Sequence, residues 1–481
     1  MLLLPPRRRR LRPGPVRRGH GTSSGWTNAW RGAASSTDTI GHISIELAGH
    51  PPREGNRREL IMQQPTPKSV SYETTMRGLL HMHQLAITGH SESDEADRVR
   101  ESMSDIWDDL TKGEKARFTG LSKDLYAISD GHESPPERIT QKQAEKKLFE
   151  AFEARTRCDW DKSLELLRMC AEHVSPARLS YFRGRVWQEG GEHKVAEVFF
   201  ENATKLEPEN DDYQSGRLYN LKGANPERAV EFAEAVLQAS TGKSPVLVLN
   251  AAEIAFEDIQ NRSEINDSEY MRLIQILRET LTRIEGKIDL LQAFGGMALS
   301  LLAMCYRCIG DTRSAIAYYT RAIPLNPWSD SLLVARGILT YGADPSAIAD
   351  FVQAIKLGSP RIWPYYFLAH HYLVTNRFDE CLEMCEQAFS KPAPSRVQSD
   401  LWSFRAVCSA VLGYPERVVR RAFENSIRID PSNEQAHHNL LSFENGLATR
   451  NTRYNFEHLS VSSIQKRYDT RMNERPSPVA V

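Results

Sequence analysis

The chain has 481 residues, of which 40% are hydrophobic and 26% are charged, and its formal net charge is −1. This near-neutral balance excludes a chain that binds nucleic acid over its whole surface. Seven cysteines spread over such a length exclude a small disulfide-stapled fold and favour a reducing compartment. No apolar run approaches the roughly 18 residues that span a bilayer. We therefore expect a cytoplasmic protein without a membrane span.

Residues 1–61 form a basic segment rich in arginine and proline. The first 60 residues hold 11 arginines against four acidic residues and show no apolar periodicity. Such a composition predicts a disordered tail, or an upstream extension with the true start at Met62. Two functional alternatives stay open: an arm for nucleic acid or an anionic membrane, and a transit-type targeting peptide. The prolines fit the second alternative poorly, because they break the helix that such peptides use.

Residues 66–135 predict a small N-terminal helical region. Serine and acidic residues at 91–97 are typical of a helix start. Thr111 and Glu114 have the spacing of a capping box. Two prolines within 132–138 end any helix there and indicate a linker.

From residue 140 onward the chain repeats. Counting back from Pro327, the positions 5, 8 and 12 residues earlier hold Ala322, Tyr319 and Ala315, and the same positions before Pro208 hold Ala203, Phe200 and Ala196. Farther back the two copies match again, with Ala303, Tyr306 and Gly310 in one and Gly184, Trp187 and Gly191 in the other. Small residues let two helices approach, the glycine falls between them, and the proline ends the second. The pattern predicts a helical hairpin of about 34 residues, whose apolar face needs a neighbouring hairpin to cover it.

These positions resemble the tetratricopeptide repeat (TPR) family. The resemblance implies an all-α fold: a right-handed superhelical solenoid of antiparallel helix pairs over residues 140–448, closed by a capping helix at 433–447. It leaves open the number of repeats and whether a polar loop at 258–268 divides the array. Residues 449–481 are expected to form a C-terminal tail, disordered like the N-terminal segment.

The resemblance also implies a function. TPR proteins are non-enzymatic scaffolds that bind protein segments in a groove, which set positions of the first helix of each hairpin line. Those positions hold Arg155, Arg178, Tyr181, Arg185, Arg307, Trp363, Tyr366 and His370. The N-terminal part would suit an acidic or carboxylate-bearing peptide, and the C-terminal part hydrophobic side chains. An accessory subunit of an enzyme or transferase complex is the remaining alternative, and the partner stays unidentified.

Catalytic and metal-binding motifs are not found. The sequence has neither a glycine-rich phosphate loop ending in lysine and serine or threonine nor a His-Glu-x-x-His motif. Cys305 and Cys308 form a C-x-x-C pair, but a zinc site needs two further ligands and none is placed nearby. Both fall inside the first helix of the best repeat, where free cysteine packs as a small apolar residue. We expect no catalytic residue, metal or cofactor.

Overall fold

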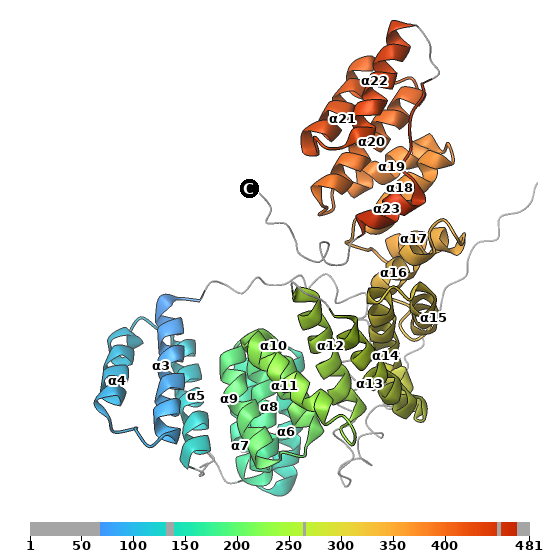
Figure 1. The fold of residues 1–481 in the computed structure, drawn as a ribbon. Coiled ribbons are helices and arrows are strands. Elements are labelled where there is room, and N and C mark those ends of the chain that lie inside the picture. Colours follow the sequence, from blue (N-terminus) through green and yellow to red (C-terminus); the bar gives the residue numbers. More distant parts are fainter. Residues whose placement is uncertain (1–67, 131–138, 263–265, 450–453, 469–481) are drawn as a thin grey trace, which may run out of the picture. The chain divides into compact units, whose positions relative to one another are not determined.

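A computed structural model describes residues 68–130, 139–262, 266–449 and 454–468. All regular structure in these ranges is helical, and it runs from α3 to α23 (Figure 1). The basic segment 1–61, the alternative start at Met62 and the predicted linker at 132–138 lie outside the described residues.

The region predicted at 66–135 contains three helices, α3 (Val70–Ile87), α4 (Asp94–Trp107) and α5 (Lys112–Asp130). The expected capping box forms, since Thr111 N donates to Glu114 Oε2 at 2.7 Å and Glu114 N donates to Thr111 Oγ1 at 3.3 Å. Phe118 and Leu121 of α5 belong to the same apolar core as Leu164 of the first hairpin. Residues 70–130 are therefore packed on the repeats.

Eight hairpins and a closing helix follow, in agreement with the predicted array. The first helices are α6 (Gln141–Thr156), α8 (Pro176–Glu189), α10 (Asp211–Ala224), α12 (Pro245–Asn261), α14 (Ile288–Cys308), α16 (Asp330–Thr340), α18 (Trp363–Val374) and α20 (Ser395–Val411). Their second helices are α7 (Trp160–Met169), α9 (His193–Leu206), α11 (Pro226–Gln238), α13 (Asp267–Glu285), α15 (Thr312–Ala322), α17 (Ser346–Lys356), α19 (Phe378–Ala388) and α21 (Glu416–Ile429). The last is α22 (Glu434–Ala448), and a short 3₁₀ turn, η1 (Ala171–His173), follows α7.

The repeated residues have the packing roles that their spacing predicts. Ala315, Tyr319 and Ala322 are buried on one face of α15. A Cβ atom at Gly184 would lie 3.1 Å from the Phe200 ring, so this glycine sets the approach of α8 to α9. Gly310 turns the chain between α14 and α15 with φ +79°, a conformation that side-chain-bearing residues rarely adopt.

The array continues across the predicted loop at 258–268. Helix α12 runs on to Asn261 and α13 begins at Asp267, so much of the expected loop is helical. Gln260 Nε2 donates to Tyr270 Oη at 2.6 Å and ties the two helices together. One core extends from α10 to α16 through this hairpin, which shows that the polar residues do not divide the array.

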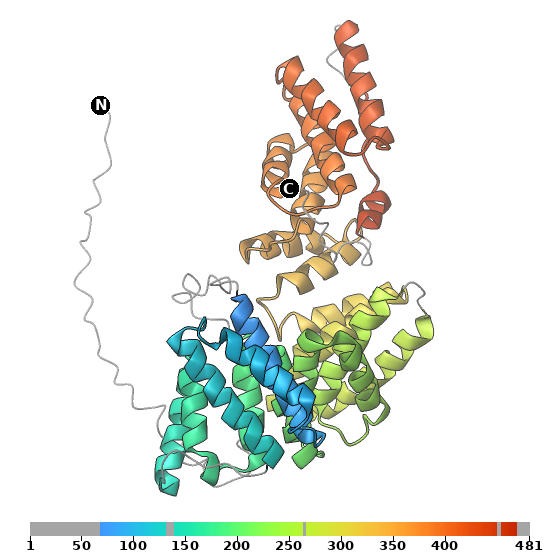
Figure 2. The ribbon, with the colours of Figure 1, turned by 90° about the vertical axis from the view of Figure 1, so that its left-hand side faces the viewer.

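The expectation of a wholly disordered C-terminal tail is wrong for residues 454–468. They form an extended stretch followed by α23 (Val461–Arg467), which Ser460 caps through Ser463 N. Tyr454, Phe456, Leu459 and Ile464 pack into the core of the C-terminal hairpins, which supplies the burial that the composition does not reveal. Figures 1 and 2 both show α23 against these hairpins.

The expectation that no apolar run approaches about 18 residues is wrong for helix α14, which is long and apolar enough to cross a membrane by length and composition alone. It packs between α13 and α15, where Ala298, Leu299 and Leu302 are buried in the core. A central position among packed hairpins accounts for its apolar character.

Candidate functional site

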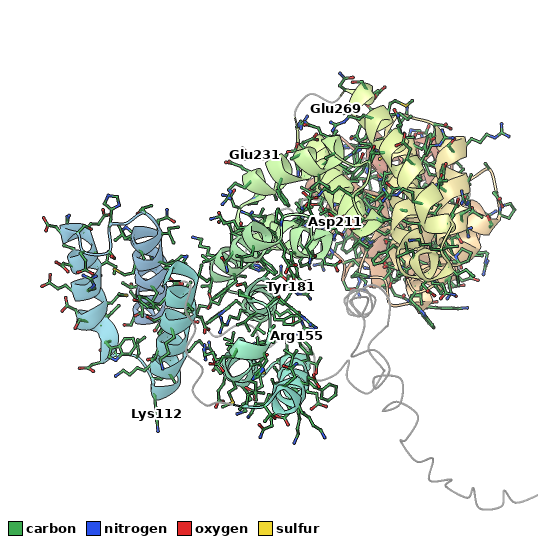
Figure 3. All side chains as sticks on the ribbon, turned by 90° about the horizontal axis from the view of Figure 1, so that it is seen from below. Lys112, Arg155, Tyr181, Asp211, Glu231 and Glu269 are labelled. Atoms are coloured by element: carbon green, nitrogen blue, oxygen red, sulfur yellow. The ribbon has the colours of Figure 1, made fainter. Side chains whose placement is uncertain are left out.

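The structure divides the predicted groove residues into two groups. Arg155 lies on α6 and Tyr181 on α8 (Figure 3). Arg178 and Arg185 also lie on α8, which Ser175 caps and Pro176 begins. The other four predicted residues lie on α14 (Arg307) and on α18 (Trp363, Tyr366 and His370).

The first group forms a continuous surface. Arg178, Tyr181 and Arg185 are spaced at three and four residues on α8, and Gln188 extends the same face by one turn. Arg155 of α6 reaches this face, since its Nε atom lies 3.7 Å from Glu189 Oε2. We call these five residues (Arg155, Arg178, Tyr181, Arg185 and Gln188) the basic surface.

Three hydrogen-bond donors of the basic surface have no partner within the described part of the chain. They are Nε of Arg178, Nε of Arg185 and Nε2 of Gln188, and all three atoms are buried. An unsatisfied buried donor costs about 1–3 kcal/mol. An acceptor supplied from outside would recover part of that free energy.

Positive charge exceeds negative charge here. Glu189 faces two guanidinium groups, with its Oε1 atom 2.9 Å from Arg185 Nη2 and its Oε2 atom near Arg155. The Arg178 guanidinium has an aromatic partner instead, lying 5.2 Å from the centre of the Phe182 ring. One carboxylate among three arginines leaves the surface cationic.

Tyr181 supports this surface rather than projecting from it. Its side chain is buried and stacks on Tyr213 of α10 with 4.9 Å between ring centres. Gly216 leaves the necessary room, because a Cβ atom there would lie 2.6 Å from the Tyr181 ring. The aromatic residue thus fixes the position of α8 beside α10.

The second group does not form the open apolar groove that the sequence predicts. Arg307 Nη1 donates to Tyr468 Oη at 3.3 Å. His370 Nε2 donates to the carbonyl of Leu459 at 2.8 Å, while Trp363 and Tyr366 are buried. These side chains are covered because residues 454–468 occupy the face they line.

The residues that hold residues 454–468 on this face were not predicted from the sequence. Asp400 on α20 is fully buried and accepts from Arg467 Nε at 2.9 Å and from Tyr366 Oη at 2.7 Å. A carboxylate among apolar residues of a first helix is a usable signal, since charged groups are rarely buried without a partner. The alternation of Tyr454, Phe456 and polar neighbours is a second signal.

The two cysteines of the C-x-x-C pair lie in packed surroundings. Cys305 is buried in the core of α14 and Cys308 is half-buried at the end of the same helix. Burial raises the pKa of the Cys305 thiol, which opposes the thiolate form that binds metals. No group of three or more histidine, cysteine or acidic side chains gathers in a metal-binding arrangement within the described ranges.

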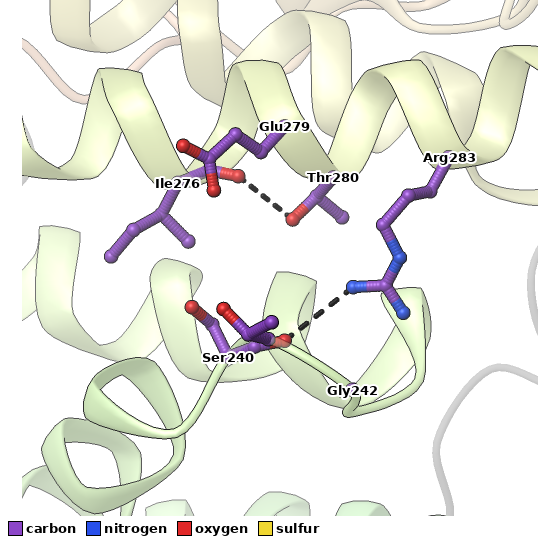
Figure 4. A pocket seen from close by; sticks show the side chains of 7 residues that line it. Ser240, Gly242, Ile276, Glu279, Thr280 and Arg283 are labelled. Carbon is purple, nitrogen blue, oxygen red and sulfur yellow. Dashed lines mark hydrogen bonds between the residues drawn. The ribbon is translucent and has the colours of Figure 1, made fainter.

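A pocket lies between the α11–α12 turn and α13 (Figure 4). Arg283 on its wall donates to the carbonyls of Ser240 and Lys243, and Thr280 Oγ1 donates to its own helix at the carbonyl of Ile276. These polar groups are already used by the fold, so the pocket has no converging set for a ligand.

The described part of the chain is thus an α-solenoid of helical hairpins with TPR-like repeated positions. Solved structures to which it is similar include residues 41 to the end of MamA from Desulfovibrio magneticus (14% identity, 38% of this chain and 96% of that chain, TM-score 0.31). A tetratricopeptide repeat protein from Parabacteroides merdae has 14% identity over 60% of this chain and 99% of that chain, with TM-score 0.37. The C-terminal part of a TPR repeat-containing protein from Cytophaga hutchinsonii has 13% identity over 60% and 98%, with TM-score 0.32. No family model matches the chain, and no curated protein sequence matches it.

Proposed function

We propose that this chain is a non-enzymatic scaffold that binds carboxylate-bearing protein segments at the basic surface. The observation that carries the proposal is the set of buried donors on Arg178, Arg185 and Gln188 that have no partner among the described residues. They lie on one face of α8, so a single extended segment can meet all three.

Carboxylates are the acceptors that suit this arrangement best. An ionised carboxylate accepts several hydrogen bonds, and its bonds to guanidinium groups are about twice as strong as neutral ones. Glu189 shows how a carboxylate lies among these guanidinium groups, because its two oxygens face Arg185 and Arg155. A partner carrying two or more acidic side chains would balance the remaining charge.

Fluorescence anisotropy of the full chain with a fluorescein-labelled hexaglutamate peptide tests the proposal. We expect saturable binding that weakens about tenfold between about 50 and 300 mM NaCl, because salt screens the contacts. The double variant Arg178→Gln/Arg185→Gln should weaken binding at least about tenfold, since it removes two charge-assisted contacts.

Arg417→Gln/Arg421→Gln is the matched control. Both arginines are exposed on α21, and the pair removes the same charge far along the chain. Equal loss of binding in the two double variants would show that net charge alone accounts for the effect. It would contradict a binding site on α8.

A further inference from the structure

Residues 454–468, the C-terminal segment, lie along the first helices of the C-terminal hairpins. Their polar contacts reach several of these helices: Glu457 meets α22, Leu459 meets α18, Gln465 meets the end of α16, and Arg467 meets α20. Tyr468 then reaches Arg307 of α14. A segment that crosses successive first helices occupies the face that a bound partner would use in a hairpin array.

Part of this binding uses the backbone of the segment. Asn439 holds Glu457 on both sides, since its Nδ2 atom donates to the Glu457 carbonyl at 3.0 Å and its Oδ1 atom accepts from Glu457 N at 2.8 Å. His370 donates to the Leu459 carbonyl. These contacts do not depend on the side chains of the segment, so a different chain could make them.

Three side chains of the segment fill specific positions. Ile464 is fully buried in the core of the hairpins. Arg467 pairs with Asp400, whose carboxylate also accepts from Asn433 Nδ2 at 3.2 Å. Tyr468 meets Trp363 edge-on with 4.9 Å between ring centres, and the Arg307 guanidinium lies 5.5 Å from its ring.

We propose that this face, formed by α14, α16, α18 and α20, is a second binding surface whose occupant in the free protein is the C-terminal segment. Its external partner is a protein segment with an aliphatic residue followed, three and four positions later, by arginine and an aromatic residue. The buried Asp400 sets the requirement for arginine, because an unpaired charge in that position is costly. A partner segment binds by displacing residues 454–468, so the C-terminal segment controls access.

The test uses a fluorescein-labelled peptide of residues 454–468 and the full chain carrying Ile464→Asp and Arg467→Glu. These changes place an acid in an apolar position and a second anion against Asp400, so they release the segment. We expect anisotropy to report binding to this variant at least about tenfold tighter than to the unchanged chain. Adding Asp400→Asn should remove most of the binding, and peptides with Arg467→Ala or Tyr468→Ala should bind at least about tenfold more weakly.

Lys466→Glu is the matched control, because Lys466 is exposed on α23 beside Arg467. This variant should keep residues 454–468 bound to the face, as in the unchanged chain. Hexaglutamate binding at the basic surface should be unaltered in the released variant, which separates this proposal from the proposed function.

Four results would overturn the proposal. One is a released variant that keeps its helical circular dichroism and thermal transition but does not bind the peptide. Another is equal binding by the released and unchanged chains. The third is loss of folding in both the released variant and a chain ending at Arg453, since the segment would then be a fixed part of the core. A doubled mass on size exclusion, with no peptide binding, would make a second copy the occupant and also contradict an external partner.

Discussion

His370 and Asp400 are buried polar side chains that each have one partner in residues 454–468. His370 donates from Nε2 to the Leu459 carbonyl, so Nδ1 is left to accept from Tyr341 Oη at 2.7 Å. Both nitrogens of a neutral ring are satisfied in this way. Arg178 and Arg185 differ, because each keeps a buried donor without a partner among the described residues. These residues therefore differ: His370 and Asp400 have their polar atoms paired within the chain, whereas Arg178 and Arg185 each keep one donor that is unpaired among the described residues.

The His370 ring makes the C-terminal segment sensitive to pH. The pKa of His370 falls from 6.5 to about 4, mainly because the ring is buried; the hydrogen bond to Leu459 opposes the fall, and the charges of nearby His458 and His371 contribute to it. When the segment is released, the ring meets water and its pKa returns toward 6.5. Between about pH 4 and 6.5, His370 binds a proton when the segment is released but not when it is bound. Lowering the pH therefore favours release of the segment, by about 2 kcal/mol at pH 5.

Hydrogen exchange of residues 454–468 between about pH 7 and 5 measures this effect, after correction for the intrinsic exchange rate. We expect protection to fall roughly 30-fold in the unchanged chain and much less in His370→Gln. His90→Gln, at an exposed histidine between α3 and α4, is the control and should behave like the unchanged chain. Identical pH dependence in all three chains would contradict the role of His370.

The hairpins could be predicted from the sequence because their spacing is a direct consequence of helix geometry. Ala315, Tyr319 and Ala322 recur at the distances that place them on one face, and Gly310 occupies a turn that requires positive φ. Such signals are local. The placement of residues 454–468 is not local, because several of its contacts join positions more than 60 residues apart, such as Arg467 with Asp400. The basic surface could be predicted for the same local reason, whereas the covered face could not.

Gly337 of α16 tests hairpin packing at the level of a single element. A Cβ atom there would lie 2.8 Å from the Phe351 ring of α17, closer than real Cβ contacts come. Gly113 of α5 has no atom within 4 Å of its Cβ position. Alanine favours a helix over glycine by about 1 kcal/mol, so Gly113→Ala should raise or preserve the melting temperature.

Gly337→Ala should instead lower the melting temperature, because overpacking costs about 1–3 kcal/mol and exceeds the helix gain. Differential scanning calorimetry measures the melting temperatures of both variants and of the unchanged chain. A rise in the melting temperature of Gly337→Ala as large as that of Gly113→Ala would show that α16 and α17 are less tightly packed than described.

Over the whole chain, two stretches of first helices have opposite chemistry. The face of α6 and α8 presents guanidinium donors, whereas the face of α14 to α20 presents a buried carboxylate and aromatic rings to an arginine and a tyrosine. Both stretches belong to the same kind of element, and the repeat therefore fixes where binding residues lie but not what they bind. This is why the sequence predicts a scaffold without predicting its partner.

Hydrogen–deuterium exchange of the full chain, with and without saturating hexaglutamate peptide, locates the surface that binds the peptide. We expect the peptide to slow exchange in α6 and α8, around Arg155 and Arg178–Gln188, and to leave exchange in residues 454–468 and α18 unchanged. Slowed exchange confined to second helices such as α7 and α9, or no change anywhere under conditions where the peptide is bound, would contradict binding at the basic surface.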